Sequence, residues 1–258
     1  MAMTQGSGSF SSFHGPLLAR VWDKSEAERE ARMAGVHCHA EGQLCGAVDG
    51  LLTVQAGGTL WMVPAAHAIW IPPHCEHGID PHGQFDGWAM LLNALLCRGL
   101  PEQPCILKVS GLLWEAVKRA ALWDDQHWDE SRDPLVAVIA AEIRSLPGAP
   151  LGLPMPTDPR LLRIARALLD DPADSRDLAG WAQWAGLSAR TLTRRFPQET
   201  GLRFQHWRQR ARLLRALERL ASGMPITTVA LELGYNTVSA FIAVFRETFG
   251  VTPGRWRG

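Results

Sequence analysis

Three polar side chains in the segment HCHAEGQLCGAVDG are spaced so that they could bind one metal ion together. His37, His39 and Gln43 all occupy odd positions, and on a strand alternate side chains point to the same face. Imidazole nitrogens and an amide oxygen suit a divalent transition metal such as Zn, Ni, Mn or Fe. The types of ligand atom do not determine which of these ions would bind.

A second group of residues, in the segment ARTLTRRF, could read DNA. Ser188 precedes this segment as a helix cap. If Leu192 and Phe196 face the core, helical spacing turns three other side chains outward. Arginine can bond guanine O6 and N7 with two hydrogen bonds, the commonest specific base contact. We expect base contacts from Arg190, Thr193 and Arg194, and phosphate contacts from Arg195 and Arg203.

The elements that must position these arginines form a helix-turn-helix pattern that occurs twice. In the first copy, a short helix at 177–184 is followed by a turn at Gly186 and the capped helix. In the second, a helix at 226–233 is followed by Gly234 and the helix VSAFIAVF. The helix predicted at 204–221 would be about 27 Å long. A strut near that length could hold two recognition helices about 34 Å apart, in successive major grooves.

The second recognition helix offers different chemistry from the first. It contains no arginine before Arg246, so its base contacts should be weaker or more apolar. Val238 or Ala243 could contact a thymine methyl, although either could equally be packing. Asn236 or Thr237 caps this helix. The candidate DNA contacts in the second copy are Asn236, Thr237, Val238, Ser239 and Arg246.

The zero net charge of the 258-residue chain hides an asymmetry between its halves. Residues 1–156 carry ten Lys and Arg against seventeen Asp and Glu, a net charge of −7. Residues 157–258 carry sixteen arginines against nine acidic residues, a net charge of +7. Such a difference indicates a nucleic-acid-binding module joined to a module of another kind.

Composition also divides the chain. Five prolines and two glycines fall within 146–159, which predicts an interdomain linker. Before it, from about Val36 to Leu92, short apolar segments broken by Gly and Pro are typical of a sandwich or small barrel, with Gly50 ending a strand. Two helical stretches follow at 112–123 and 134–145. These helices could pack against the barrel, form a dimer interface, or do both.

A set of residues at fixed spacings runs through about 90 residues of the C-terminal half. It comprises Leu178-Ala179, Gly186-Leu187-Ser188, Arg190-Thr191-Leu192, Arg194, Phe196, Glu199-Thr200-Gly201, Leu233-Gly234-Tyr235, Ser239, Phe241, Phe245-Arg246, Phe249-Gly250 and Thr252-Pro253. This pattern resembles the AraC/XylS family of transcription regulators. The resemblance implies a tandem helix-turn-helix reader and base contacts at the three outward positions of the first recognition helix.

In the N-terminal half, His37, His39 and Gln43 are followed by Gly50, and Pro72 to His77 reads P-x-H-x-x-H. These spacings resemble the two motifs of the cupin fold, H-x-H-x-x-x-E followed by Gly and P-x-G-x-x-H, with Gln43 in place of Glu and His74 in place of Gly. The resemblance implies His77 as a third histidine beside His37, His39 and Gln43. A three-histidine zinc site has precedent. The alternative is that these histidines are the polar lining of a pocket for an organic effector.

Two further features of the N-terminal half bear on function: four aromatic side chains, and the occurrence of enzymes among metal-dependent cupins. Trp61, Trp70, Phe85 and Trp88 could line a small-molecule cavity or simply belong to the core. Metal-dependent cupins include enzymes, so the alternative function is a cupin enzyme with an appended helical interaction domain. Fusion to a DNA-binding module favours a regulator without catalytic activity.

We therefore expect a multi-domain α and β protein with a cupin-like β-barrel, or jelly roll, before an all-α tandem helix-turn-helix domain. Expected partners are promoter DNA, a small-molecule or metal effector, a second copy of the chain and RNA polymerase. No apolar stretch approaches the roughly 20 residues of a membrane span, and no secretory signal is evident, so we expect a cytoplasmic protein. The predicted segments are a flexible N-terminus (1–14), the sensor (15–100), a helical dimerisation segment (101–146), the linker (147–158) and the DNA-binding domain (159–258).

Overall fold

A computed structural model describes residues 15–22, 35–124, 127–149 and 151–256. The predicted flexible N-terminus lies outside these residues. The chain divides into two compact units, Met1–Gly152 and Leu153–Gly258. Within the described residues no helix is long and apolar enough to cross a membrane. Each unit is described by itself below.

The first unit is built on an antiparallel sheet of eight strands. Its main order is β1-β5-β2-β4-β6-β7, and β3 pairs with both β2 and β8. This confirms the expectation of a β-rich N-terminal domain before a helical one. The strands are β1 (Leu17–Trp22), β2 (Gly42–Ala56), β3 (Thr59–Pro64), β4 (His67–Ile71), β5 (His77–Leu92), β6 (Cys105–Lys108), β7 (Gly148–Ala149) and β8 (Gly152–Pro154).

Two strands are much longer than the sequence pattern predicted. β2 has 15 residues and β5 has 16, and they pair along almost their whole length, from Gly42 opposite Leu92 to Ala56 opposite His77. Gly50 does not end a strand, as predicted, but lies inside β2 with a φ of +80°. The register shifts between Ala47 and Leu51, so Gly50 marks an irregularity in one continuous strand.

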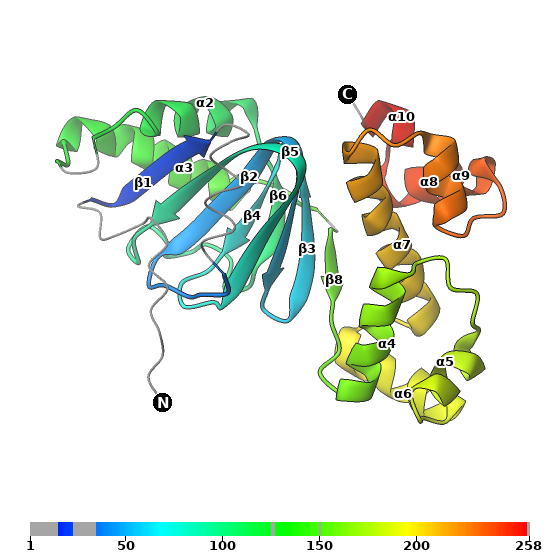
Figure 1. The fold of residues 1–258 in the computed structure, drawn as a ribbon. Helices are drawn as coiled ribbons and strands as arrows, with labels where there is room; N and C mark the ends of the chain where they lie inside the picture. The colour runs from blue at the N-terminus through cyan, green and yellow to red at the C-terminus, as the bar shows by residue number, and fades with distance from the viewer. Residues whose placement is uncertain (1–14, 23–34, 125–126, 150, 257–258) are drawn as a thin grey trace. The chain divides into compact units, whose positions relative to one another are not determined.

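Two helices cover one face of this sheet (Figure 1). α2 (Gly111–Ala120) and α3 (Asp133–Ser145), which follows the 3₁₀ turn η1 (Glu130–Arg132), lie close to their predicted positions. Each buries four side chains at positions i, i+3, i+4 and i+7, the pattern of a one-sided surface helix. They pack on the sheet through a shared core that includes Leu44, Trp70, Trp88, Met90, Leu113, Val117, Ile139 and Ile143.

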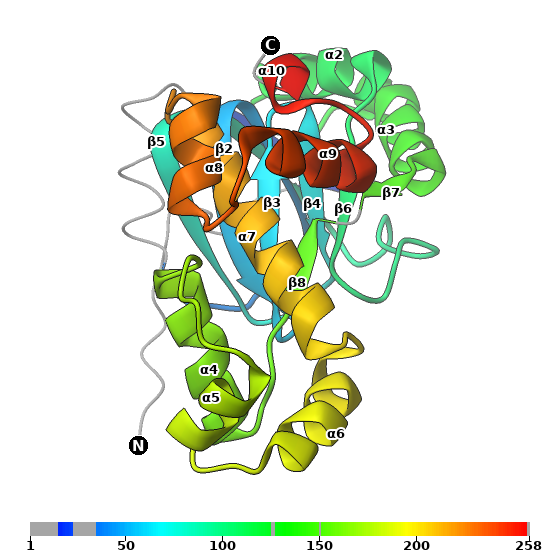
Figure 2. The ribbon, with the colours of Figure 1, turned by 90° about the vertical axis from the view of Figure 1, so that its right-hand side faces the viewer.

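The second unit consists of helices arranged along α7 (Phe204–Ala221). Figure 2 shows α5 and α6 at the N-terminal end of α7 and α8 and α9 at its C-terminal end. α7 buries Trp207, Leu214 and Leu217 among its neighbours. The other helices are α4 (Pro159–Asp170), α5 (Leu178–Trp184), α6 (Ala189–Thr200), α8 (Ile226–Glu232), α9 (Val238–Phe249) and α10 (Pro253–Trp256).

The stretch at 147–158, predicted as a linker without sheet, contributes β7 and β8. Its backbone finds partners despite its prolines, because the Met62 amide donates to the Leu151 carbonyl at 3.0 Å. The Trp207 indole N–H donates to the Pro154 carbonyl at 2.7 Å. The unit boundary at Gly152 nevertheless falls inside this stretch.

Candidate nucleic-acid interface and histidine cluster

The first helix-turn-helix, α5 and α6, is fixed by two caps and one glycine. Asp177 accepts the Gly180 amide at the start of α5, and Ser188 accepts the Thr191 amide at the start of α6. Gly186 has a φ of +69°, which suits glycine in the turn between them. Leu192 and Phe196 are fully buried, as helical spacing predicted.

That burial leaves the outer face of α6 to the predicted base-reading residues. Arg190, Thr193 and Arg194 are all exposed, and no ion pair engages either arginine within the described residues. The Thr193 hydroxyl donates to the Ala189 carbonyl at 2.9 Å. Their contacts with DNA remain a prediction, and the geometry leaves both guanidinium groups available for it.

Arg195 has a different environment from the phosphate contact predicted for it. Its guanidinium lies 2.7 Å from an Asp158 oxygen and 3.4 Å from a Glu199 oxygen. The hydrogen bond from Arg160, with Arg195 nearby, lowers the pKa of Asp158 to about 2. Glu199 also accepts the Thr157 and Asp158 amides. Arg195 therefore helps to hold the start of α4, whereas Arg203 is exposed.

Several arginines of α7 are also used inside the unit. Arg208 donates to the backbone carbonyls of Asp174 and Arg176 and is 9% exposed. Arg212 and Arg215 donate to the carbonyls of Pro172 and Leu169 at 2.7 and 3.1 Å. These side chains fix the end of α4 and the segment after it, so part of the positive charge in this half is structural.

The second helix-turn-helix, α8 and α9, presents a small, polar and uncharged surface at the start of α9. Thr237, not Asn236, caps α9 by accepting the Ala240 amide. Phe241 and Phe245 are fully buried. Asn236, Ser239 and Arg246 are exposed, while Val238 is half-buried and Ala243 is exposed. Ala240 is also exposed at the start of α9, and it is not among the DNA contacts predicted from the sequence. Helical spacing from the buried Phe241 and Phe245 would have predicted its exposure.

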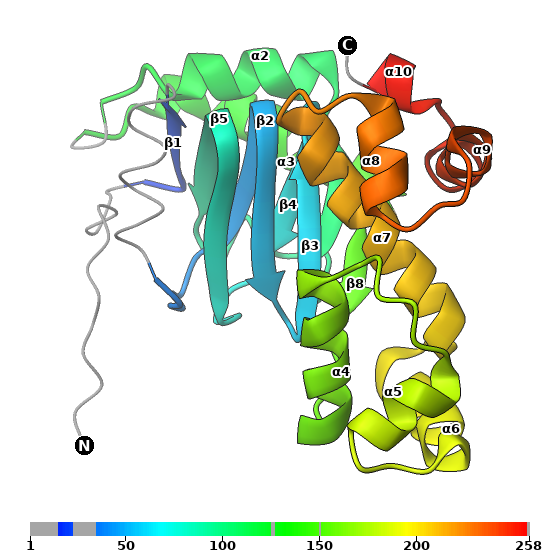
Figure 3. The ribbon, with the colours of Figure 1, turned by 45° about the vertical axis from the view of Figure 1, so that its right-hand side comes forward.

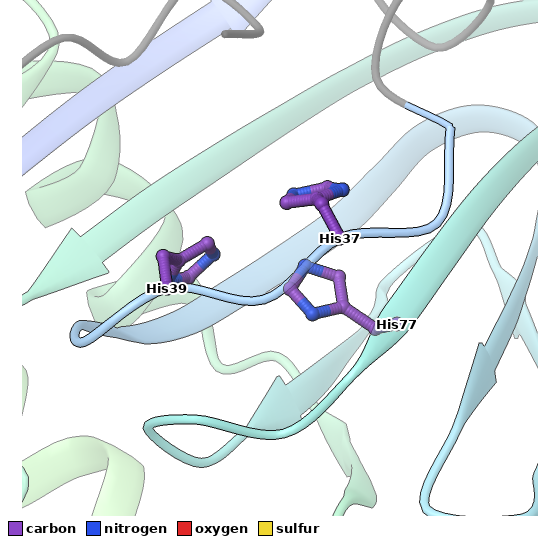
Figure 4. Close-up of side chains that lie close together, drawn as sticks. All are labelled: His37, His39 and His77. Carbon is purple, nitrogen blue, oxygen red and sulfur yellow. The ribbon is translucent and has the colours of Figure 1, made fainter. Parts of the chain in front are cut away.

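The three predicted histidine ligands of the first unit come together (Figure 4). One ring nitrogen from each of His37, His39 and His77 lies within 4.8 Å of the others. Gln43 is 4% exposed, and its Oε1 lies 3.0 Å from His39 Nε2 and 3.1 Å from His77 Nε2. Four residues separated by up to 40 positions thus form one cluster.

Contrary to the prediction from the sequence, the histidines are not placed by a single strand. β2 begins only at Gly42, so His37 and His39 precede it and do not share its face with Gln43. His37 instead forms an isolated bridge with His77, with both backbone hydrogen bonds at 2.9 Å. The His74 amide donates to the His39 carbonyl at 2.8 Å. Pairing with the start of β5 and the residues just before it therefore brings the rings together.

Backbone carbonyls orient all three histidines. The Nδ1 atoms of His37, His39 and His77 lie 3.1, 2.9 and 2.8 Å from the carbonyls of Gly35, Glu41 and Cys75. A carbonyl can only accept, so each Nδ1 donates its proton, and in a neutral ring the Nε2 atom then keeps its lone pair. Metal-binding histidines are commonly oriented in this way. No sequence signal identifies these carbonyls, because every residue has one.

This donor set fits a divalent cation. Burial lowers the pKa of His77 to about 4, which keeps its ring neutral near neutral pH. Gln43 Oε1 and an unprotonated Nε2 are both acceptors, so they repel at 3.0 Å unless a cation intervenes or the amide turns to donate. Adjacent ligands about 2.1 Å from an octahedral ion would themselves be about 3.0 Å apart. A hollow of about 290 Å³ lined by His77, Cys75 and Gly57 adjoins the cluster.

Comparisons with known proteins agree with the C-terminal architecture. A family profile described as a helix-turn-helix domain matches residues 181–258. The chain is 33% identical to the HTH-type transcriptional regulator NimR of Escherichia coli K12 over 230 residues, covering 86% of this chain and 81% of NimR. It is 33% identical to the arabinose operon regulatory protein of the same strain over 104 residues, covering 40% of this chain and 36% of that protein.

Among solved structures, fatty-acid-bound ToxT from Vibrio cholerae strain SCE256 is similar with a TM-score of 0.40 and 10% identity. That match covers 96% of this chain and 97% of ToxT.

Proposed function

This chain belongs to the AraC family of helix-turn-helix transcriptional regulators, and from that premise we propose that it binds promoter DNA sequence-specifically under the control of its N-terminal unit. The observation that carries the proposal is the repeated helix-turn-helix along α7 (Figure 3). On the first recognition helix, α6, Arg190 and Arg194 are exposed. A second copy of the chain and RNA polymerase are further proposed partners.

In this proposal α6 and α9 each enter a major groove. α7 has 18 residues, which corresponds to about 27 Å. Recognition helices one turn of DNA apart, about 34 Å, would lie in successive grooves on one face of the duplex. A single chain would then contact two adjacent half-sites.

The two helices would share the work unequally. Arg190 and Arg194 would each bond a guanine edge from α6. α9 would contribute methyl contacts from Ala240 and Ala243 and hydrogen bonds from Asn236 and Ser239. The guanine-rich contacts should therefore fall in one half-site.

The test is binding of the purified chain to the DNA upstream of its own gene, against a scrambled duplex of equal length. Because phosphate contacts respond to salt, the titration is repeated at several salt concentrations. We expect selective binding whose affinity falls with salt. Equal affinity for DNA upstream of its own gene, DNA upstream of the neighbouring genes and scrambled DNA would contradict sequence-specific regulation.

For the sensor we propose that His37, His39, Gln43 and His77 hold one divalent transition metal. When bound, the ion would cross-link the segment before β2 to the start of β5. A polar lining for an organic effector, with the Gln43 amide donating to both rings, is the competing arrangement. Either occupant could shift the equilibrium between sensor arrangements that favour and oppose DNA binding.

Metal content distinguishes these two arrangements. Elemental analysis should find about one ion per chain in the wild type and none in His39→Ala/His77→Ala. His67→Ala is the matched control, because His67 lies outside the cluster at the start of β4. If the wild type takes up no Zn, Ni, Mn or Fe on reconstitution, the metal site is excluded and the polar lining of a pocket for an organic effector is the remaining arrangement.

A further inference from the structure

A second hollow in the first unit lies away from the histidine cluster, where α2 begins. Its volume is about 230 Å³. A cavity of about 150 Å³ is enough to bind benzene, so this one has room for one or two fused rings. The walls come from β2, β5, the segment before α2 and α2 itself. They include Val48, Trp88, Val109, Ser110, Gly111 and Trp114.

Two indole rings give this hollow its shape. The rings of Trp88 and Trp114 are 6.2 Å apart between centroids and inclined at 39°. Gly46 fixes the Trp88 ring, because a Cβ at Gly46 would lie 2.6 Å from it. At this separation the two rings pair with each other, so a flat ligand would stack on the more exposed Trp114 ring beside Trp88.

Trp88 also supplies an unused hydrogen-bond donor. The residue is 2% exposed, yet its indole N–H has no hydrogen-bond partner among the described residues. The Nε1 atom is also not fully enclosed by protein atoms. Tryptophan N–H groups usually find a partner when buried. A ligand with a hydrogen-bond acceptor would provide one.

The polar side of the hollow disfavours an anion. Ser110 caps α2 by accepting the Leu113 amide, and its hydroxyl donates to a Glu142 carboxylate oxygen at 2.5 Å. That carboxylate places negative charge beside the helix N-terminus. Lys118, 5.5 Å from the Trp114 ring, is paired with Glu115 at 2.7 Å. The surrounding charges therefore favour a neutral ligand.

We propose that this hollow is a binding site for a small, neutral, planar heteroaromatic molecule that stacks on Trp114 and accepts a hydrogen bond from Trp88. The proposal rests on the sensor role stated above and names the chemical class of an organic effector. The site is separate from the histidine cluster, so the two can be occupied independently. It uses the start of α2 as one wall, which gives a ligand direct contact with a helix of the shared core.

The test uses quinoline as the probe. Naphthalene is the control ligand, because it has the same shape but no hydrogen-bond acceptor. Saturation-transfer NMR on the full chain without DNA should detect quinoline binding with a dissociation constant below about 1 mM and weaker binding of naphthalene. Trp114→Ala should weaken quinoline binding at least tenfold. Trp88→Phe should remove the preference for quinoline, and quinoline-4-carboxylate should bind at least tenfold more weakly.

Trp123→Ala is the matched control, because Trp123 packs on the same core without lining the hollow. It should bind quinoline as the wild type does, and unfolding curves confirm that each variant folds. No quinoline binding by the wild type, or unchanged binding by folded Trp114→Ala, would overturn the proposal. Arg190→Ala/Arg194→Ala should still bind quinoline, so loss of DNA selectivity and loss of this site are distinguishable.

Discussion

The two helix-turn-helix units share one backbone plan. α5 and α8 have seven residues each, and α6 and α9 have twelve. Each turn contains a glycine with positive φ, Gly186 or Gly234, and each recognition helix starts at a capping hydroxyl. Each ends at a left-handed glycine, Gly201 or Gly250. Two equivalent pairs of side chains are buried, Leu192 with Phe196 and Phe241 with Phe245.

Their outer surfaces differ at every equivalent position. Counting from the caps, Arg190 corresponds to Ser239, Arg194 to Ala243, and Arg195 to Val244. The requirements of folding thus preserve caps, turn glycines and buried rings, while the exposed positions are free to diverge. From this difference we expect α6 to supply the charged base contacts and α9 the weaker ones.

The largest effect should follow from Arg190→Ala/Arg194→Ala. Each bidentate guanine contact is worth about 1–3 kcal/mol, so affinity for the specific DNA should fall by about 100-fold or more. Arg98→Ala/Arg144→Ala removes the same charge from exposed positions of the first unit and should change affinity little. Competition binding with labelled DNA measures both. An equal loss of DNA affinity in the two double variants would mean that the α6 arginines act only through the net charge of the protein.

Arg208→Ala should lower the free energy of unfolding by about 2–4 kcal/mol, because it leaves the carbonyls of Asp174 and Arg176 without their donor and opens a cavity. Arg190→Ala, at an exposed position, should change stability by less than about 0.5 kcal/mol. Urea unfolding of the full chain compares them. Similar stabilities would mean that the α7 arginines are not structural.

The turn glycines allow a direct comparison between the two units. Gly186→Ala should cost about 1 kcal/mol, since only the left-handed backbone is strained and open space surrounds the new Cβ. Gly234→Ala should cost more, because its Cβ would also lie 3.2 Å from Ala173 Cα. Thermal unfolding should therefore rank Gly234→Ala as the less stable variant. The reverse order would show that the second turn can adjust.

Asn236→Ala/Ser239→Ala should weaken specific DNA binding by about tenfold or less, because the contacts proposed for α9 are uncharged. The slope of affinity against salt should stay unchanged, since no phosphate-neutralising cation is lost. The same competition assay applies. A loss as large as that of the α6 double variant would make the two helices equal readers.

The smallest effect concerns acid. Asp158, paired with Arg160 and Arg195, has a pKa of about 2, below the ordinary value of 3.8. Its stabilising contribution is present above about pH 4 and is lost as the pH falls toward 2. Asp158→Asn should thus be less stable than the wild type at pH 6, with the difference shrinking by pH 3. Urea unfolding at both pH values checks this, and a constant difference would exclude the ion pair as its cause.

The sequence by itself determined the local structure of the second unit. Ser188 and Thr237 cap helices, Gly186 and Gly234 turn the chain, and Leu192 and Phe196 face inward, all through interactions within a few residues. Such signals are readable because they do not depend on distant parts of the chain. The bounds of α7 at 204–221 follow from the same local periodicity.

Only the tertiary structure decided which charged and polar side chains are available. Arg195 and Arg208 are arginines in a basic half like Arg190, yet each is bound to a group far along the chain. Arg195 pairs with Asp158, 37 residues away, and Arg208 donates to carbonyls more than 30 residues away. The cluster likewise depends on pairing between His37 and His77, not on a shared strand. Exposure and convergence depend on long-range packing, which spacing along the chain does not encode.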